Sequence, residues 1–288
     1  MINVDVICPV YKSFESVKSL IESLKLQKDV SIKRIMCSLT ISDDENEDRR
    51  IEEFFKENSV TYFKINKDEF SHSLTREKMI REYCEEDIVV LLTQDVVLAD
   101  DHSLFNLVQS ISNKETAYNY GRQLVKKNCI EKYIKKRNYP KESHVSSKKE
   151  HMTVMDYFAS DSFSAIDRNI FLEINGYQGK NVMFNEDQLL AYYLINKGYK
   201  KGYVADSKVY HYHKYKLKDL KERYYQSGKF YADNIEFKNI KTNGAGFRLS
   251  LYVLGQILIH FDLVSLFLFI PNMLSRYIGF KKGKRSNH

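Results

Sequence analysis

The stretch Ile88-Val-Val-Leu-Leu-Thr-Gln-Asp95 decides the fold of this chain. Its first five residues are apolar and begin with three β-branched side chains, which predicts a strand covered on both faces. Asp95 follows at the carboxyl end, where open α/β sheets bind their ligands. A carboxylate is also the ligand type that Mg²⁺ and Mn²⁺ prefer. The alternative role for Asp95 is a turn or helix N-cap, for which aspartate is equally suited.

Strand-like and helix-like segments alternate on both sides of this stretch. Before it, strands are expected at 4–10, 35–41 and 60–65, and helices at 16–26, 51–57 and 73–84. After it, strands are expected at 116–120, 158–166 and 202–210, and helices at 103–111, 168–174 and 186–197. This alternation predicts an α/β fold with a mostly parallel, Rossmann-like central sheet flanked by helices. The basic segment 126–150 is expected to be a mobile or acceptor-facing insertion.

The composition is that of a globular protein with a patchy positive charge. The 288 residues are 43% hydrophobic and 29% charged, with a formal net charge of +7. The cations concentrate at 126–149, 214–223 and 281–285, which indicates either attraction to phosphates and lipid headgroups or a solvated lysine-rich surface. No nucleic-acid-binding signature accompanies the charge, so no nucleic-acid partner is expected. The four cysteines have no close spacing, and no signal peptide is expected before Val4. Both observations favour reduced thiols in the cytoplasm.

The C-terminal stretch differs in character from the rest. Residues 249–269 are very apolar, but Gln256, His260 and Asp262 interrupt them. A central aspartate in a spanning helix costs about 2.5–3.5 kcal/mol, so a single span is disfavoured. One expectation is two shorter helices at the bilayer interface. They would be broken near Pro271 and followed by the basic residues 281–285. A helical hairpin packed on the catalytic core is the other. The expected domains are therefore a catalytic domain, 1–235, and a helical, membrane-associated extension, 236–288.

Further side chains with useful chemistry stand near the ends of the expected elements. Glu186-Asp187 begins a helix, where Asp187 can act as a general base or both carboxylates can merely favour the helix dipole, which lowers a carboxylate pKa. His211 and His213 leave a strand on one face and could complete a metal site, touch a diphosphate, or be ordinary surface histidines. Arg76 can clamp a phosphate.

The acidic loop that begins at Asp43-Asp44 follows the second strand. A carboxylate there can accept the imide N–H of uracil or thymine. The alternative is a solvated acidic turn.

Taken together, these motifs resemble the inverting family 2 glycosyltransferases of the GT-A fold, and more closely the bacterial rhamnosyltransferases that build O-antigen and capsule. The resemblance spans nearly the whole chain. The motifs that carry it are Pro9-Val10-Tyr11, Asp43 to Asp48, Phe70 to Arg76, Leu92 to Asp95, Tyr120 to Leu124, Asn138 to Pro140, Asn185-Glu186-Asp187, Gly198-Tyr199, Tyr203 to Asp206, Val209 to His213 and Tyr277 to Lys281.

The resemblance implies roles for particular residues. Asp95 is the surviving acid of the metal site and His211 joins it, while Asp187 is the catalytic base with Glu186 beside it. Among the implied donor-binding residues, Asp43 holds the base and Arg76 the diphosphate. The full nucleotide-sugar-binding set is Pro9, Val10, Tyr11, Asp43, Asp44, Thr75, Arg76, Gln94 and Asp161, and Arg122 and His213 are weaker candidates for the acceptor or the diphosphate.

The sequence departs from the family pattern near the donor pocket, where Ser73-Leu74 replaces Gly-Gly, Glu77 and Asp161 each replace Asn, and Asp167-Arg168 replaces Arg-Arg. The implied activity is transfer of L-rhamnose from dTDP-L-rhamnose, with Mg²⁺ or Mn²⁺, to a lipid-linked oligosaccharide at the cytoplasmic face of the bacterial cell membrane. One alternative is the same reaction with a UDP-hexose or UDP-N-acetylhexosamine donor. Another is a catalytically silent domain that serves membrane assembly. A nucleotidyltransferase is disfavoured because no glycine-rich basic loop follows the first strand.

Overall fold

The computed structural model describes residues 1–238, 240 and 244–286. The chain forms two compact units. The first comprises 1–123, 141–148 and 157–211, and the second comprises 124–140, 149–156 and the chain from Tyr212 onward. The functional division at residue 235 stays a prediction.

The first unit is built on one mixed sheet in the order β3-β2-β1-β4-β8-β6-β9-β5, with β7 paired to β9. The strands are β1 (Ile2–Val10), β2 (Val30–Thr40), β3 (Thr61–Ile65), β4 (Ile88–Leu92), β5 (Val96–Leu98), β6 (Tyr118–Leu124), β7 (His144–Ser146), β8 (Phe163–Asp167) and β9 (Lys201–His211). Its helices are α1 (Phe14–Lys25), α2 (Glu45–Glu57), α3 (His72–Glu82), α4 (Ser103–Ser112), α6 (Arg168–Glu173) and α7 (Glu186–Asn196). A 3₁₀ turn, Val154–Tyr157, belongs to the second unit up to Asp156.

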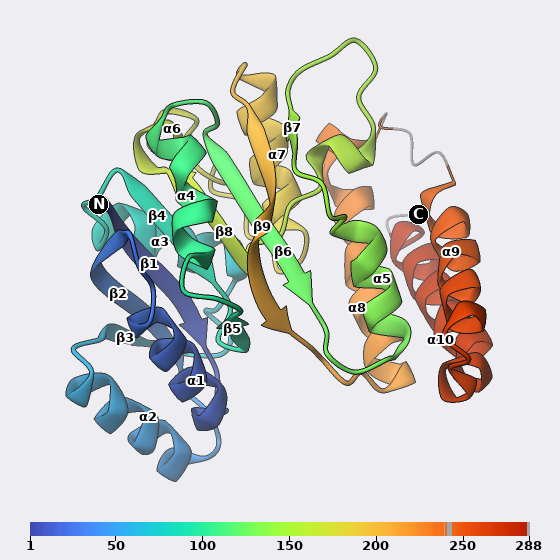
Figure 1. Cartoon of the computed structure of the whole chain (residues 1–288), viewed down its shortest axis with the longest axis horizontal. Helices are drawn as coiled ribbons and strands as arrows, with labels where there is room; N and C mark the ends of the chain where they lie inside the picture. The colour runs from blue at the N-terminus through green and yellow to red at the C-terminus, as the bar shows by residue number, and fades with distance from the viewer. Residues whose placement is uncertain (239, 241–243, 287–288) are drawn as a thin grey trace. The chain divides into compact units, whose positions relative to one another are not determined.

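The parallel part of the sheet is the half formed by β3, β2, β1 and β4. Figure 1 shows β1 and β2 side by side in blue; β3 lies next to β2, and β4 lies next to β1. From β8 onward the sheet changes: β8 runs antiparallel to both β4 and β6, and β9 runs antiparallel to both β5 and β7. The chain reverses its direction of growth between β1 and β4. Open α/β sheets bind their ligands at such a reversal, outside the carboxyl ends of the two strands.

Burial confirms the expected covering of β4 on both faces. All five residues of β4 are buried, and Val90 and Leu92 belong to a core that α1, α2 and α4 close with side chains such as Leu20, Phe55 and Leu107. Side chains alternate along a strand, so Val89 and Leu91, which are equally buried, face the other side of the sheet. The apolar run that precedes Asp95 is therefore fixed from both sides.

The second unit is helical and contains α5 (Ile130–Asn138), α8 (Leu217–Asp233), a 3₁₀ turn (Ile235–Phe237), α9 (Ala245–Ile259) and α10 (Leu263–Lys284). The expectation of a mobile insertion at 126–150 is wrong for α5. Its Ile130, Tyr133 and Ile134 pack with Val253 and Ile257 of α9. These three residues have i, i+3, i+4 spacing, and the surrounding lysines mask that apolar stripe in the sequence.

The break between the C-terminal helices lies at His260–Asp262 and not near Pro271, which is inside α10. Asp262 begins α10 by accepting the backbone N–H of Ser265. A proline inside a helix removes one backbone hydrogen bond and costs about 3 kcal/mol. By length and composition alone α10 could cross a membrane, since its most apolar window has a mean hydropathy of 1.4.

Candidate active site

The ends of β1 and β4 are joined by one side chain, Gln94. Its Oε1 accepts the backbone N–H of Tyr11 at 2.6 Å, and its Nε2 donates to the carbonyl oxygens of Tyr11 and Lys12 at 3.0 and 3.1 Å. Lys12 and Ser13 adopt left-handed backbone conformations, which turn the chain sharply after β1. Gln94, predicted as a nucleotide-binding residue, thus holds the loop that follows β1 in place.

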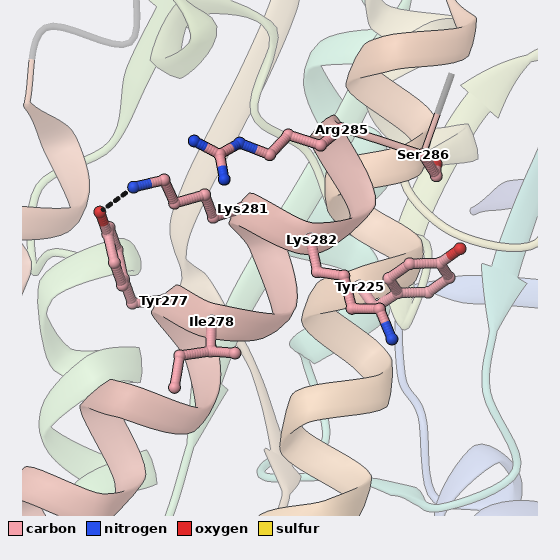
Figure 2. A pocket seen from close by; sticks show the side chains of 7 residues that line it. All are labelled: Tyr225, Tyr277, Ile278, Lys281, Lys282, Arg285 and Ser286. Carbon is pink, nitrogen blue, oxygen red and sulfur yellow. Dashed lines mark hydrogen bonds between the residues drawn. The ribbon is translucent and has the colours of Figure 1, made fainter. Parts of the chain in front are cut away.

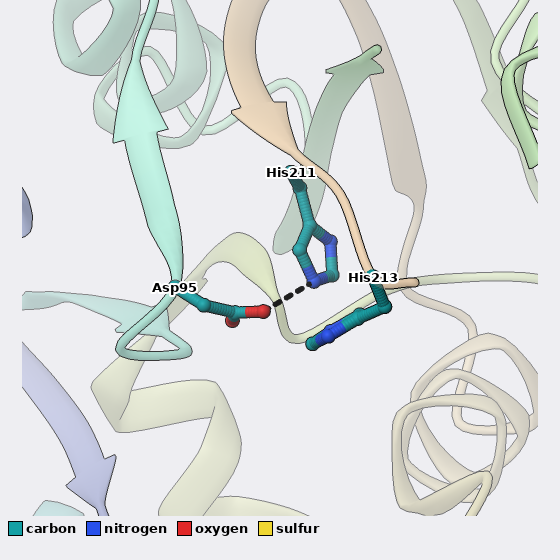
Figure 3. A group of neighbouring side chains, drawn as sticks. All are labelled: Asp95, His211 and His213. Atoms are coloured by element: carbon teal, nitrogen blue, oxygen red, sulfur yellow. Dashed lines mark ion pairs between the residues drawn. The ribbon is translucent and has the colours of Figure 1, made fainter. Parts of the chain in front are cut away.

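Asp95 and His211 form a candidate metal site at this edge of the sheet. The register of β5 on β9 pairs Val96 with His211, so Asp95 lies directly beside the histidine. Asp95 Oδ2 is 3.2 Å from His211 Nε2, and His211 is buried while Asp95 remains partly accessible (Figure 3). One carboxylate and one imidazole suit Mn²⁺ in particular, and the carboxylate suits Mg²⁺.

The other ring nitrogen of His211 is fixed by Gln123. His211 Nδ1 lies 2.8 Å from Gln123 Oε1, and Gln123 Nε2 donates to Ser160 Oγ at 2.8 Å. Because the amide oxygen can only accept, Nδ1 carries the proton and the lone pair of Nε2 is directed at Asp95. Two acceptor atoms 3.2 Å apart repel each other unless a proton or a cation lies between them. The pair therefore fits a divalent cation, with Gln123 orienting the histidine.

The two weaker candidates, Arg122 and His213, lie close in the sequence to Gln123 and His211, respectively. Arg122 is partly exposed and precedes Gln123 in β6, so strand alternation turns its side chain to the opposite face from Gln123. His213 follows His211 by two residues, in the segment with which the second unit resumes. Their roles stay predictions.

A second cluster gathers three carboxylates around one buried arginine. Arg76 in α3 is only 1% exposed, and its Nη1 donates to Glu186 Oε1 in an ion pair. Its Nη2 donates to the carbonyl oxygen of Asp161 at 3.3 Å. Burial lowers the pKa of Arg76, but Glu186 and Asp161 raise it more, so the guanidinium stays charged. The structure therefore holds Arg76 within the protein, and its predicted contact with a diphosphate stays a prediction.

Asp161 lies in the turn before β8 and accepts three hydroxyl groups. Tyr118 Oη and Ser164 Oγ each donate to Oδ1 at 2.6 Å, and Tyr177 Oη donates to Oδ2 at 3.2 Å. The residue is 1% exposed. These contacts fix Asp161 within the carboxylate cluster, and its predicted role in binding the nucleotide sugar stays a prediction.

Asp187 is the most accessible carboxylate of this cluster. Asn185 and Glu186 start α7, and Asp187 is partly exposed in its first turn, accepting the backbone N–H of Gln188 at 2.7 Å. Removal from water, Glu186 and Asp161 raise the pKa of Asp187 well above its ordinary value. The helix dipole, expected to lower this pKa, is outweighed. A raised pKa makes Asp187 a stronger base near neutral pH.

The pKa of Glu186 is raised as well, in a cluster that has more carboxylates than cations. Burial raises the pKa of Glu186 to about 7, although Arg76 beside it acts in the opposite direction. Three carboxylates against one guanidinium leave two excess negative charges if all ionise. A proton is therefore retained by the Glu186–Asp187 pair until the pH approaches neutrality.

The two clusters are connected through the turn that contains Ser160 and Asp161. Ser160 accepts from Gln123, the partner of His211, while the adjacent Asp161 accepts from Arg76, the partner of Glu186. Both clusters also act on one buried thiol. Burial and Cys37 raise the pKa of Cys8, Arg76 lowers it and Asp95 raises it. Asp95 and the Arg76 partner of Glu186 are thus both near Cys8 in β1.

The expected base-binding end is a small exposed group beside β1 and β2. Lys12 forms an ion pair with Asp43, whose pKa it lowers, so the exposed carboxylate stays ionised. Tyr11 is 37% exposed, and the Nζ atoms of Lys12 and Lys67 lie 5.4 and 5.5 Å from the centre of its ring. An exposed ring flanked by cations suits an aromatic base that carries phosphates.

The remaining predicted donor residues have structural contacts. Asp44 caps α2 by accepting the backbone N–H of Glu47, and the Thr75 hydroxyl accepts the backbone N–H of Ser71 in the interior. Pro9 and Val10 are buried at the end of β1. Sequence reasoning missed Gln123, Ser160, Tyr118 and Tyr177 as supporting residues. Only Gln123 had a signal, since it belongs to the quoted Gly-Arg-Gln-Leu motif.

Comparisons with known proteins add independent findings. No family model matches the chain. The O-antigen chain rhamnosyltransferase RfbN of Salmonella typhimurium is 32% identical over 236 residues, which cover 78% of this chain and 73% of that protein. The O-antigen chain rhamnosyltransferase WbaN of Salmonella anatum is 31% identical over 230 residues, covering 76% of this chain and 71% of that protein.

Solved structures confirm the expected GT-A fold. Residues 1–349 of TarS from S. aureus give a TM-score of 0.55 at 13% identity, over 97% of this chain and 90% of that chain. The mannosyltransferase PcManGT of Pyrobaculum calidifontis, in complex with GDP-Man and Mn²⁺, gives a TM-score of 0.56 at 12% identity, over 99% and 86%. Identities this low show the fold alone.

Proposed function

Because the chain belongs to the family of O-antigen chain rhamnosyltransferases, a family of GT-A glycosyltransferases, we propose that it transfers L-rhamnose from dTDP-L-rhamnose to a hydroxyl group of a lipid-linked oligosaccharide. The observation that carries the proposal is the continuous set of contacts from Asp95 through His211, Gln123 and the Ser160–Asp161 turn to the Arg76–Glu186 pair. It supports a cation-dependent donor site and a base at one sheet edge.

The donor's nucleoside is expected at the Tyr11–Asp43 group. The ionised Asp43 carboxylate can accept the imide N–H of thymine, and the Tyr11 ring offers a face for the base. In this arrangement the diphosphate extends toward Asp95. A Mg²⁺ or Mn²⁺ ion held by Asp95 and His211 would neutralise the negative charge that develops on the departing nucleoside diphosphate.

Asp187 is the proposed catalytic base. The acceptor hydroxyl oxygen forms a bond to the anomeric carbon as the bond from that carbon to the diphosphate oxygen breaks, which inverts the configuration. The hydroxyl proton passes to Asp187, whose raised pKa suits that role. Glu186, held by Arg76, fixes the first turn of α7 and thereby positions Asp187.

The expected place of action is the cytoplasmic face of the bacterial cell membrane, with peripheral binding. The helices α9 and α10 support this, because Phe261, Val264 and Phe267 are large apolar side chains that stand mostly exposed. Contiguous exposed apolar surface of this kind marks an interaction site. The oligosaccharide acceptor would be presented there on its lipid.

Mass measurement of the product tests the function directly. Purified protein with Mn²⁺, dTDP-L-rhamnose and a lipid-linked acceptor should add one deoxyhexose mass. The D187N variant should lose transfer while dTDP still binds. D206N, which changes an exposed aspartate on β9, is the matched control and should stay active. Transfer from UDP-hexoses but not from dTDP-L-rhamnose would reject the donor, and full activity of D187N would reject the base.

A further inference from the structure

The helices α8 and α10 approach each other through glycine. A Cβ atom added to Gly279 would lie 2.2 Å from the carbonyl oxygen of Lys221, and one added to Gly283 would lie 1.9 Å from that of Tyr225. On the opposite helix, a Cβ on Gly228 would lie 2.1 Å from the carbonyl oxygen of Phe280. Only glycine permits this separation. The side of α10 that carries Gly279 and Gly283 therefore packs against α8. The larger side chains of α10 lie on its other sides.

A hollow of about 500 Å³ lies beside this helix contact (Figure 2). Its lining residues are Tyr225, Tyr277, Ile278, Lys281, Lys282, Arg285 and Ser286. Three are cations and two are phenols, and none of the seven is acidic. The carboxylates of Asp219 and Glu222 line a separate hollow that shares Tyr225 and Lys282.

Among the residues that the structure describes, no carboxylate forms an ion pair with Lys281 or Lys282. Lys281 Nζ donates to Tyr277 Oη at 3.1 Å, and Lys282 Nζ lies 6.0 Å from the centre of the Tyr225 ring. Within the described part of the chain, Arg285 has no ion-pair partner. Three cationic side chains that line one hollow together with two phenols are suited to a phosphate, which accepts several charge-assisted hydrogen bonds.

An apolar stripe leads along α10 to this hollow. Leu263, Phe267, Ile270, Leu274 and Tyr277 follow at spacings of four and three residues and therefore share one face of the helix. All five are exposed, Phe267 by 82%. From Leu263 to Tyr277 the stripe covers 14 helical steps, or about 21 Å at 1.5 Å per residue.

The opposite side of α10 is polar and occupied. Arg276 forms an ion pair with Glu131 of α5 and donates to Tyr224 Oη of α8 at 2.6 Å. Arg276 is 7% exposed, so this contact is part of the interior of the helical unit. A helix tied on one side and apolar on the other is suited to lie along a membrane surface rather than across it.

We propose that this hollow is a binding site for the phosphate group of an anionic membrane lipid, whose acyl chains lie along the exposed stripe of α10. The inference deepens the membrane placement proposed above and does not depend on the transferase chemistry. The occupant follows from charge and shape together: three unneutralised cations meet the phosphate, and the adjoining apolar face meets the hydrocarbon.

The contribution of the three cations to the affinity for an anionic bilayer can be estimated. Each cation near an anionic bilayer contributes about fivefold in affinity, equivalent to about 1 kcal/mol, so three contribute on the order of 100-fold. The C-terminal end of α10 carries roughly half a negative charge from the helix dipole, which offsets only a small part of this. Binding should weaken as salt rises, because exposed charges are screened.

Vesicle co-sedimentation of the full chain tests the proposal. Wild-type protein is compared with K281Q/K282Q/R285Q and with K33Q/K197Q/K200Q, a control that removes three exposed lysines from the first unit. Vesicles contain phosphatidylcholine alone or mixed with phosphatidylglycerol. The proposal predicts an on-the-order-of-100-fold loss on mixed vesicles for the first variant and little loss for the control. It also predicts much weaker wild-type binding to pure phosphatidylcholine.

Three results would overturn the inference: equal losses in the two variants, unchanged binding of the first, or equal binding of wild-type protein to both vesicle types. Inorganic phosphate, added at an ionic strength matched with chloride, separates the two phosphate sources. Displacement of the protein by phosphate beyond the chloride effect would point to a free-anion site and would count against a lipid.

Transfer of sugar to a water-soluble acceptor, measured on the same variants, should be unchanged. A protein that binds vesicles but transfers no sugar would overturn the proposed function alone.

Discussion

Replacing Arg76 with methionine removes the cation that pairs with Glu186 in the carboxylate cluster while keeping most of the side-chain volume. Glu186 then stays buried beside Asp161 and Asp187 without its ion-pair partner. Removing one partner of a buried pair costs about 3–5 kcal/mol, because the remaining charge is neither hydrated nor paired. We expect R76M to lower the free energy of unfolding by that amount at pH 8.

The loss should depend on pH with a defined sign. The pKa of Glu186 is raised to about 7 in the folded protein, and Arg76 acts to lower it. A carboxyl group with a raised pKa stabilises the folded state most below its unfolded pKa, and this contribution disappears as the pH rises through the folded pKa. Without Arg76 the pKa of Glu186 rises further. At pH 5 the group is then neutral, and the penalty in R76M should be much smaller than at pH 8.

Urea unfolding followed by tyrosine fluorescence measures this, since the chain has 21 tyrosines and no tryptophan. R49M, which removes an exposed arginine, is the control and should change stability by less than about 0.5 kcal/mol. The double variant R76M/E186Q should recover much of the loss at pH 8, because no unpaired charge remains. Equal destabilisation of R76M at both pH values, or no recovery in the double variant, would refute the reasoning.

Three further predictions follow from other contacts. D161N should move the acid limb of the transfer rate to lower pH, because Asp161 raises the pKa of both Glu186 and Asp187; a pH–rate profile that matches wild type would contradict this. Q123L should weaken Mn²⁺ binding about 10–100-fold in calorimetry, since it removes the partner that orients His211; unchanged affinity would reject the site. G283L should separate α8 from α10 and speed amide exchange in both helices, with G255A in α9 as a control, because nothing lies within 4 Å of a Cβ there; protection equal to wild type would contradict the close packing.

The fold follows from the sequence wherever burial imposes a simple pattern. The apolar run at Ile88 predicts a strand covered on both faces, and the alternation before it predicts the parallel half of the sheet. The antiparallel return of β8 beside β4 has no comparable local signal, because pairing direction depends on the whole chain path. Asp44 shows the same limit on a smaller scale: α2 begins at Glu45, six residues before the expected start, because the aspartate caps it.

The candidate site is partly visible in the sequence. Asp95, His211 and Asp187 stand at element ends, so their types and positions suffice to select them. The role of Arg76 is different, because a guanidinium suits a phosphate or a carboxylate equally, and only the folded structure brings Glu186, 110 residues away, into contact with it. The direction of the pKa shift at Asp187 likewise depends on neighbours that the helix position alone does not reveal.

The central claim is that a cation at Asp95 and His211 and a base at Asp187 serve one reacting centre. Paramagnetic broadening of ¹³C-labelled aspartate carboxyl signals, with Mn²⁺ and dTDP bound to the protein, measures that proximity. We expect strong broadening of the Asp187 signal and little for Asp29, which lies at the opposite end of β1 and is hydrogen-bonded to Ile2. A sharp Asp187 signal in the presence of bound Mn²⁺ would contradict the account.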